Sequence, residues 1–114
     1  MGSRFLILIF AFISLCYSQN EINIKNLAII ENIYFVKDSK KPFSGSAFSF
    51  SKLTREKILE FQIIDGKKNG MYSEWYINGK KKSKYNFQNN LKHGRYTTYY
   101  QNGKKKEKGF WKHG

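Results

Sequence analysis

The sequence has little of the chemistry from which active sites are usually built. It contains one cysteine, two histidines and only eight acidic residues among 114. These few groups form no paired carboxylates and no Ser-His-Asp arrangement, and the chain has no glycine-rich nucleotide loop. His93 and His113 occupy different positions of the repeat described below, and neither has a carboxylate or a second histidine at metal-ligand spacing. We therefore predict a protein that is not an enzyme and has no metal, cofactor or small-molecule substrate.

The first 18 residues differ in composition from the rest. Arg4 precedes an apolar run, Phe5 to Cys16, of about 12 residues, whereas a membrane-spanning helix needs roughly 20. This pattern is typical of a helical secretory signal peptide at residues 1–18, with cleavage after Ser18. A buried N-terminal helix or an uncleaved anchor is the alternative. A lipoprotein signal fits less well, because Leu15 and not a small residue precedes the cysteine.

A signal peptide predicts export to the periplasm, the envelope or the extracellular space. Its cleavage would remove Cys16, the only cysteine, so the mature chain would have no disulfide and no thiol nucleophile. This excludes a disulfide-stapled extracellular module and is compatible with a bacterial envelope protein.

Basic residues outnumber acidic ones by 21 to 8, which gives a formal net charge of +13. The excess is uneven: residues 65–114 contain 13 Lys or Arg and three acids, whereas residues 19–64 contain seven and five. Aromatic residues make up 18% of the chain, so it has the means to fold. The charge implies attraction to anionic partners, or simply good solubility.

The C-terminal half repeats with a period of 24 residues. DGKKNGMYSEWYINGKKKSKYNFQ (65–88) aligns without gaps with NNLKHGRYTTYYQNGKKKEKGFWK (89–112), and a looser copy occupies residues 44–64. A period of this length predicts stacked units that cannot bury their own faces alone. A lead-in segment with a short strand is expected at residues 19–43, followed by repeats at 44–114. The positions that define the repeat are Gly70 and Gly94, Tyr72 and Tyr96, Asn78-Gly79 and Asn102-Gly103, and Phe87 and Trp111.

Each unit is expected to be an antiparallel β-hairpin. Asn-Gly between two aromatic-rich runs predicts a two-residue type I′ turn, and DGKKNG and NNLKHG are expected to be polar connections. Gly70 and Gly94 are expected to leave room for the large ring opposite. Counting outward from the first turn pairs Tyr76 with Lys81, Trp75 with Lys82, Tyr72 with Tyr85 and Gly70 with Phe87. The same count in the next hairpin pairs Tyr100 with Lys105, Tyr99 with Lys106, Tyr96 with Gly109 and Gly94 with Trp111.

Because side chains alternate along a strand, this register separates two faces, which a one-residue slip would exchange. The face expected to be buried carries Tyr72, Tyr76, Tyr85, Phe87, Tyr96, Tyr100 and Trp111. The other carries Trp75, Tyr99 and Phe110 among Lys80, Lys82, Lys84, Lys104, Lys106 and Lys108. This lysine stripe is the candidate surface for an anionic partner, with Glu74 and Glu107 expected to moderate its repulsion. The alternative is a solvated face, whose lysines protect the sheet edge and shield the rings.

Two stretches, IIDGKKNGMYSEWYINGKKK and FQNNLKHGRYTTYYQNGKKK, share a pattern of spaced glycines, an aromatic pair and Asn-Gly-Lys. On these residues the chain resembles the bacterial MORN-variant repeat family, which includes proteins labelled YwqK-like antitoxins. The segment YFVKDSKKPFSG (34–45) is similar to the lead-in of exported members. Asn90 departs from the pattern by replacing its first glycine, and residues 44–64 lack the Asn-Gly turn and most of the lysines. The resemblance implies an all-β, open, single-layer meander of hairpins, and it implies interaction or membrane association far more than catalysis.

Several functions remain open from the sequence. The first is an exported binding module whose basic, aromatic-studded face meets anionic lipid, polysaccharide or an acidic protein. A structural repeat that docks on a larger exported partner cannot be separated from it. The second is an antitoxin-like protein that neutralises a partner protein, which only the family resemblance suggests. Nucleic-acid binding fits the charge and the rings but not the secretory start. The sequence does not fix the oligomeric state.

Overall fold

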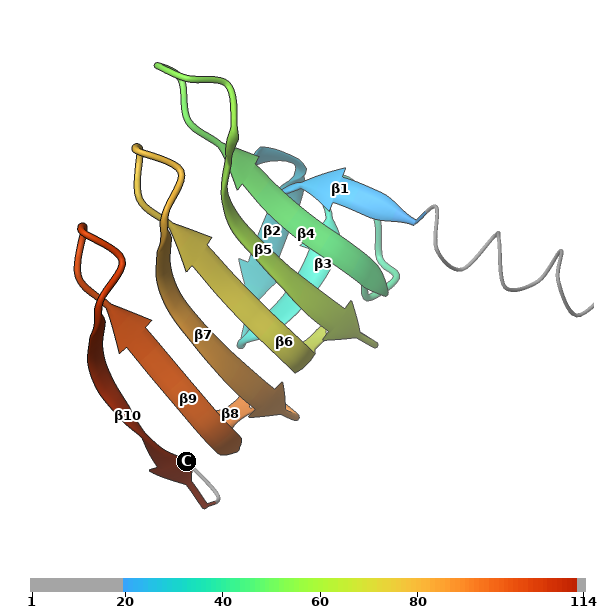
Figure 1. The fold of residues 1–114 in the computed structure, drawn as a ribbon. Helices are drawn as coiled ribbons and strands as arrows, with labels where there is room; N and C mark the ends of the chain where they lie inside the picture. The colour runs from blue at the N-terminus through green and yellow to red at the C-terminus, as the bar shows by residue number, and fades with distance from the viewer. Residues whose placement is uncertain (1–19, 113–114) are drawn as a thin grey trace, which may run out of the picture.

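The computed structural model describes residues 20–112, so the predicted signal peptide and its cleavage site lie outside the described residues. This part of the chain is almost entirely β-structure, with one short 3-10 helix, Ile24–Asn26 (η1), and no α-helix (Figure 1). In residues 20–112 no helix is long and apolar enough to cross a membrane. The prediction of an all-β fold is confirmed.

One large open sheet forms most of the molecule. Its strand order is β1-β4-β5-β6-β7-β9-β10, with the short strand β8 paired to β7. Neighbouring strands are antiparallel except for β1, which runs parallel to β4. The strands are Glu21–Asn23 (β1), Gly45–Phe50 (β4), Lys57–Ile64 (β5), Lys67–Trp75 (β6), Lys81–Gln88 (β7), Leu91–Lys92 (β8), Gly94–Tyr99 (β9) and Lys105–Trp111 (β10).

A second, two-stranded sheet covers one end of the large sheet. Its strands, Leu27–Ile30 (β2) and Ile33–Val36 (β3), form a hairpin beside β4 and β5 (Figure 1). The Tyr34 ring lies 5.7 Å from the ring of Phe61 on β5. The large sheet is therefore single-layered only over β6 to β10. The lead-in segment, residues 19–43, was expected to contain one short strand and contains more structure than that. The buried core lies between the two sheets and consists of Leu27, Phe43, Ala47, Phe61 and Ile63.

Two-residue turns close the hairpins at one end of the large sheet. Asp65-Gly66 joins β5 to β6, and Asn89-Asn90 joins β7 to β8. All four residues have positive φ, between 49° and 78°, as a type I′ turn requires. Polar connections were expected over DGKKNG and NNLKHG, but each connection takes only the first two residues of its segment, and most of the remaining residues belong to strands.

The Asn-Gly turns at the other end differ from the predicted geometry. Only Gly79 and Gly103 adopt positive φ there, 85° and 90°. The N–H of Tyr76 donates to the carbonyl of Lys80 at 2.8 Å, which encloses a three-residue loop. Asn78 contributes through its side chain, whose Oδ1 accepts from the N–H of Lys80 at 2.9 Å. A three-residue loop with a left-handed glycine adds a bulge, so the predicted two-residue turn was wrong.

Neighbouring turns are joined by side chains. The Tyr76 hydroxyl donates to the carbonyl of Tyr99 at 2.6 Å, and Asn78 Nδ2 donates to the carbonyl of Gln101 at 2.9 Å. The turn between β6 and β7 is thereby tied to the turn between β9 and β10, which lies beside it in Figure 1.

The longer loop changes the register next to each turn, and a bulge then restores it. Trp75 pairs with Lys81 and Tyr99 with Lys105, so the predicted pairs nearest the turns were wrong. Lys82 and Lys106 are each left without a ladder partner, which shifts the register by one residue. Beyond this point the predicted pairs are confirmed: Tyr72 with Tyr85, Gly70 with Phe87, Tyr96 with Gly109 and Gly94 with Trp111.

Gly70 and Gly94 are needed for backbone conformation and not for space. Their φ angles are 94° and 75°, where L side chains are strained. A Cβ at Gly94 would meet nothing within 4 Å, and one at Gly70 would meet only the Gln62 side chain at 3.5 Å. The predicted role of these glycines, room for the opposite ring, was wrong.

A ring does lie over a glycine elsewhere in the sheet. At Gly109 a Cβ would lie 2.7 Å from Cε1 of Tyr96, so the tyrosine ring occupies the space that a side chain would fill. This contact resembles the aromatic rescue of glycines in designed sheets.

Candidate anion-binding surface

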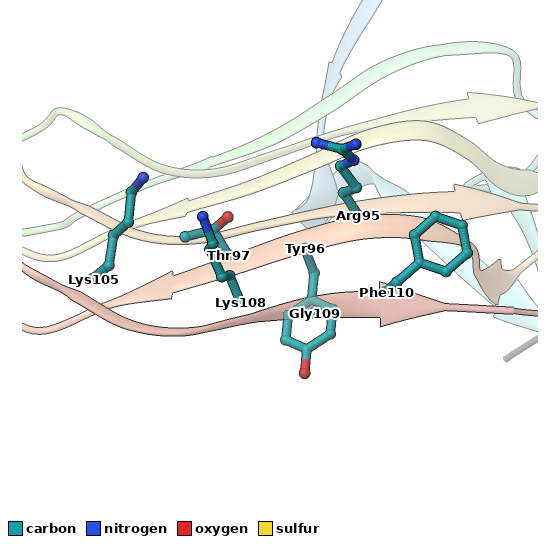
Figure 2. Close-up of a pocket in the computed structure, with 7 residues that line it drawn as sticks. All are labelled: Arg95, Tyr96, Thr97, Lys105, Lys108, Gly109 and Phe110. Carbon is teal, nitrogen blue, oxygen red and sulfur yellow. The ribbon is translucent and has the colours of Figure 1, made fainter.

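The side of β6, β7, β9 and β10 that points away from the β2–β3 hairpin is rich in cations. Across the strands, Lys84 pairs with Ser73 and Thr97, and Thr97 pairs with Lys108. Figure 2 shows Arg95, Thr97, Lys105, Lys108 and Phe110 projecting together from β9 and β10, with Tyr96 on the opposite side. We call this side the cationic face and define it by Trp75, Lys81, Lys84, Arg95, Tyr99, Lys105, Lys108 and Phe110.

The six lysines predicted for this surface occupy three different environments. Lys84 and Lys108 lie on the cationic face, together with the predicted rings Trp75, Tyr99 and Phe110. The Nζ atom of Lys80 donates to the carbonyl of Asn102 at 3.2 Å, and Lys104 lies beside the equivalent turn. The ammonium groups of Lys82 and Lys106 lie 5.8 and 5.9 Å from the ring centres of Tyr76 and Tyr100.

Three cations of the face were missed by the sequence analysis. Lys81 and Lys105 replace Lys82 and Lys106 because of the bulge, and Lys81 Nζ lies 5.6 Å from the Trp75 ring centre. A glycine in the third loop position was the signal for this geometry. Arg95 could have been placed by alternation alone, because it precedes Tyr96 in the same strand.

Residues 65–112 contain three acids, and none of them lies on the cationic face. Asp65 is in the turn between β5 and β6. The Glu74 carboxylate accepts the Ser83 hydroxyl at 2.8 Å, on the side that carries Tyr72 and Tyr85.

Glu107 is also on that opposite side, where its Oε1 accepts the Tyr96 hydroxyl at 2.5 Å. The two glutamates therefore do not sit among the cations whose repulsion they were expected to moderate. The one ion pair among residues 20–112 joins Lys57 and Glu60 at 3.6 Å, on β5.

The cations of the cationic face are close enough to repel one another. Lys84 and Lys108 are separated by one intervening strand, or about 10 Å, which is comparable to the ~8 Å screening length at physiological salt. Arg95, Lys105 and Lys108 border a shallow hollow of about 440 Å³ (Figure 2). Phe110 at its rim is 66% exposed. The cationic face is therefore suited to anionic groups. Residues 20–112 contain no cluster of three His, Cys, Asp or Glu that could hold a metal ion.

The opposite side of these strands, together with the same side of β5, carries a continuous row of aromatic contacts. Ring centres lie 5.3 Å apart for Phe61 and Tyr72 and 5.7 Å apart for Tyr96 and Trp111, and the rings of Tyr85 and Tyr96 stack at 5.6 Å. We call this side the ring face and define it by Phe61, Tyr72, Tyr85, Phe87, Tyr96 and Trp111.

The expectation that seven rings of the C-terminal repeats form a buried face was wrong, because none of the seven is buried. On the ring face only Phe61, which lies beneath the β2–β3 hairpin, is buried. The rings of Tyr72, Tyr85, Phe87, Tyr96 and Trp111 are half-buried, as is Tyr76, and Tyr100 is 51% exposed.

No family model matches the chain. No curated protein and no solved structure is significantly similar to it either. The resemblance to MORN-variant repeats therefore stays a prediction that rests on the sequence motifs.

The environment of Tyr72 predicts a loss of stability at alkaline pH. Burial, followed by the Glu74 carboxylate and the neighbouring Tyr34 and Tyr85, raises the pKa of Tyr72 from 10.0 to about 12. The unfolded chain then loses this proton at a lower pH than the folded protein does. The stabilisation is complete below about pH 10 and is lost as the pH rises towards 12.

Denaturant unfolding at a series of alkaline pH values measures this effect, with Tyr72→Phe as the control. We expect the unfolding free energy of the wild type to fall more steeply with pH than that of the variant. Equal slopes would show that the Tyr72 hydroxyl does not contribute.

Proposed function

We propose that this chain is an exported, non-catalytic binding module that attaches reversibly to an anionic lipid surface through its cationic face. The observation that carries the proposal is the segregation of charge. Five cations lie on one side of β6 to β10, whereas the acids of these strands lie on the other. The 24-residue units, with their resemblance to MORN-variant repeats, favour the same kind of role.

The shape and exposure of the face support a lipid surface as the partner. Strands β6 to β10 carry no second layer on this side, so several cations can approach a flat surface together (Figure 1). Lys84, Arg95, Lys105 and Lys108 are exposed, and exposed Phe110 can enter the headgroup region beside them. Each cation near an anionic membrane contributes about 1 kcal/mol, so five give reversible and salt-sensitive attachment.

Reversal of two charges on the cationic face should abolish this attachment. We expect Lys84→Glu/Lys108→Glu to lower the affinity for anionic vesicles by at least about 30-fold, because losing two favourable contacts alone removes about 2 kcal/mol. Co-sedimentation with vesicles made with and without anionic lipid measures the effect at two salt concentrations.

The matched control is Lys37→Glu/Lys40→Glu, which changes the net charge equally at two exposed positions of the β3–β4 connection. It should retain near wild-type binding. The proposal fails if the wild type does not prefer anionic vesicles or if the control loses as much affinity. Retention on an acidic protein or an acidic polysaccharide through the cationic face, without vesicle binding, would also contradict the lipid assignment.

A further inference from the structure

Two lysines lie on the ring face, each against a set of aromatic rings. Lys68 Nζ is 4.8 Å from the ring centre of Phe87, 5.6 Å from that of Tyr72 and 6.0 Å from that of Phe61. Lys68 is half-buried, and so is the second lysine, Lys92.

The second lysine, Lys92, lies one repeat later in the chain. Its Nζ is 4.6 Å from the ring centre of Tyr85 and 5.1 Å from that of Trp111. Tyr85 follows Phe61 by 24 residues, and Trp111 follows Phe87 by 24. The repeat thus builds the same lysine-and-ring site twice. A repeat advances by two strands, so the two sites are about 10 Å apart across the sheet.

Neither ammonium group has a carboxylate partner within residues 20–112, where the one ion pair is on β5. The two acids on this side are bonded to the hydroxyls of Ser83 and Tyr96. Burial, followed by the charge of Lys92, lowers the pKa of Lys68. An anionic group between the two lysines would relieve this repulsion, which the rings offset only in part.

The surroundings of Lys68 determine what kind of anion can reach it. The β2–β3 hairpin rises beside it, and the two together border a hollow of about 320 Å³ whose other walls include Asn32, Tyr34 and Asn90. A flat membrane cannot lie against this stepped side, whereas a single polymer chain can cross the open strands β10, β9 and β7 and end in the hollow (Figure 1). The half-exposed, stacked rings of Tyr85 and Tyr96 offer the apolar surface on which the C–H faces of sugars pack.

We propose that the ring face binds an acidic polysaccharide that runs across the strands, with one carboxylate at Lys68 and the next at Lys92. The spacing of the two sites corresponds to one disaccharide unit, so the preferred polymer carries one carboxylate per disaccharide. This surface is opposite the cationic face, and the inference does not depend on the proposed attachment to lipid.

The test uses the emission of Trp111, which touches Lys92. In a Trp75→Phe background Trp111 is the only remaining tryptophan. The probes are an octasaccharide of alternating uronic acid and N-acetylhexosamine, its disaccharide, a neutral octasaccharide and inorganic polyphosphate. We expect saturable binding of the acidic octasaccharide, and at least about tenfold weaker binding of the disaccharide because it reaches one site at a time.

Variants then separate site binding from general attraction. Lys68→Gln/Lys92→Gln should lose at least about tenfold in affinity for the acidic octasaccharide. The control Lys67→Gln/Lys37→Gln removes the same charge at two exposed positions and should retain most of the affinity. Lys68→Arg/Lys92→Arg keeps the charge and should also retain most of it. Lys84→Glu/Lys108→Glu should change octasaccharide binding by less than about threefold at physiological salt.

Three outcomes would overturn the inference: equal binding of polyphosphate and the acidic octasaccharide, equal binding of the neutral octasaccharide, or equal losses in the glutamine pair and its control. Loss of vesicle binding in Lys84→Glu/Lys108→Glu with retained octasaccharide binding would support both proposals separately. If one of the two proposals fails, the measurement that tests the other is not affected.

Discussion

Replacement of Phe61 by alanine is expected to cost about 3–5 kcal/mol of the unfolding free energy, the range found for large-to-small changes at buried aromatic residues. Phe61 is 4% exposed and lies between the rings of Tyr34 and Tyr72, at 5.7 and 5.3 Å. It therefore joins the β2–β3 hairpin to the large sheet. Domains of this size have a total stability of about 5–15 kcal/mol, so the variant should be close to unfolding.

Denaturant unfolding followed by circular dichroism measures this loss. Phe110→Ala removes the same side chain from a position that is 66% exposed, and we expect a change within about 0.5 kcal/mol. If both variants lose the same free energy, the core does not lie between the two sheets as described.

Replacement of Gly66 by alanine is expected to have the second large effect. Gly66 has a φ of 78°, and a Cβ there would overlap Cγ2 of Ile33 and lie 3.1 Å from the carbonyl oxygen of Tyr34. The carbonyl of Gly66 accepts the Tyr34 N–H at 2.8 Å, and the N–H of Gly66 donates to the Phe43 carbonyl at 2.7 Å. The variant should lose about 1–2 kcal/mol for the left-handed conformation and about 1–3 kcal/mol more for the overlap.

Gly94→Ala is the matched control for this experiment. Gly94 has nearly the same φ, 75°, but a Cβ there would meet nothing within 4 Å. It should lose only the conformational part, about 1–2 kcal/mol. Equal losses in the two variants would mean that the Asp65-Gly66 turn is not packed against β3.

Much of the C-terminal sheet could be predicted because its determinants are local. The 24-residue repeat and the aromatic-rich runs predicted antiparallel hairpins, and the pairs remote from the turns, such as Tyr72 with Tyr85, were predicted correctly. The errors near the turns came from reading Asn-Gly as a two-residue turn. Asn78 caps the loop with its side chain instead, and only Gly79 takes the left-handed conformation.

The position of the core could not be predicted from the same local patterns. It depends on the contact of Leu27 and Phe43 with Phe61 and Ile63, residues that lie far apart in the chain. Periodicity within one strand gives no information about which segment covers it. The rings of the C-terminal strands were therefore predicted to be buried, although within residues 20–112 no second sheet covers them. The prediction of the lysine surface was partly wrong for a local reason, because the bulge places Lys81, and not Lys82, on the cationic face.

The bulges at Lys82 and Lys106 keep the three-residue loops compatible with the two faces of the sheet. If the ladder continued from Trp75 and Lys81 without a bulge, Lys84 would pair with Tyr72 and the lysines of β7 would turn to the aromatic side. The same change in β10 would pair Lys108 with Tyr96. Deletion of either unpaired lysine leaves every other pair in place, so the chain can shorten by one residue here without exchanging its faces.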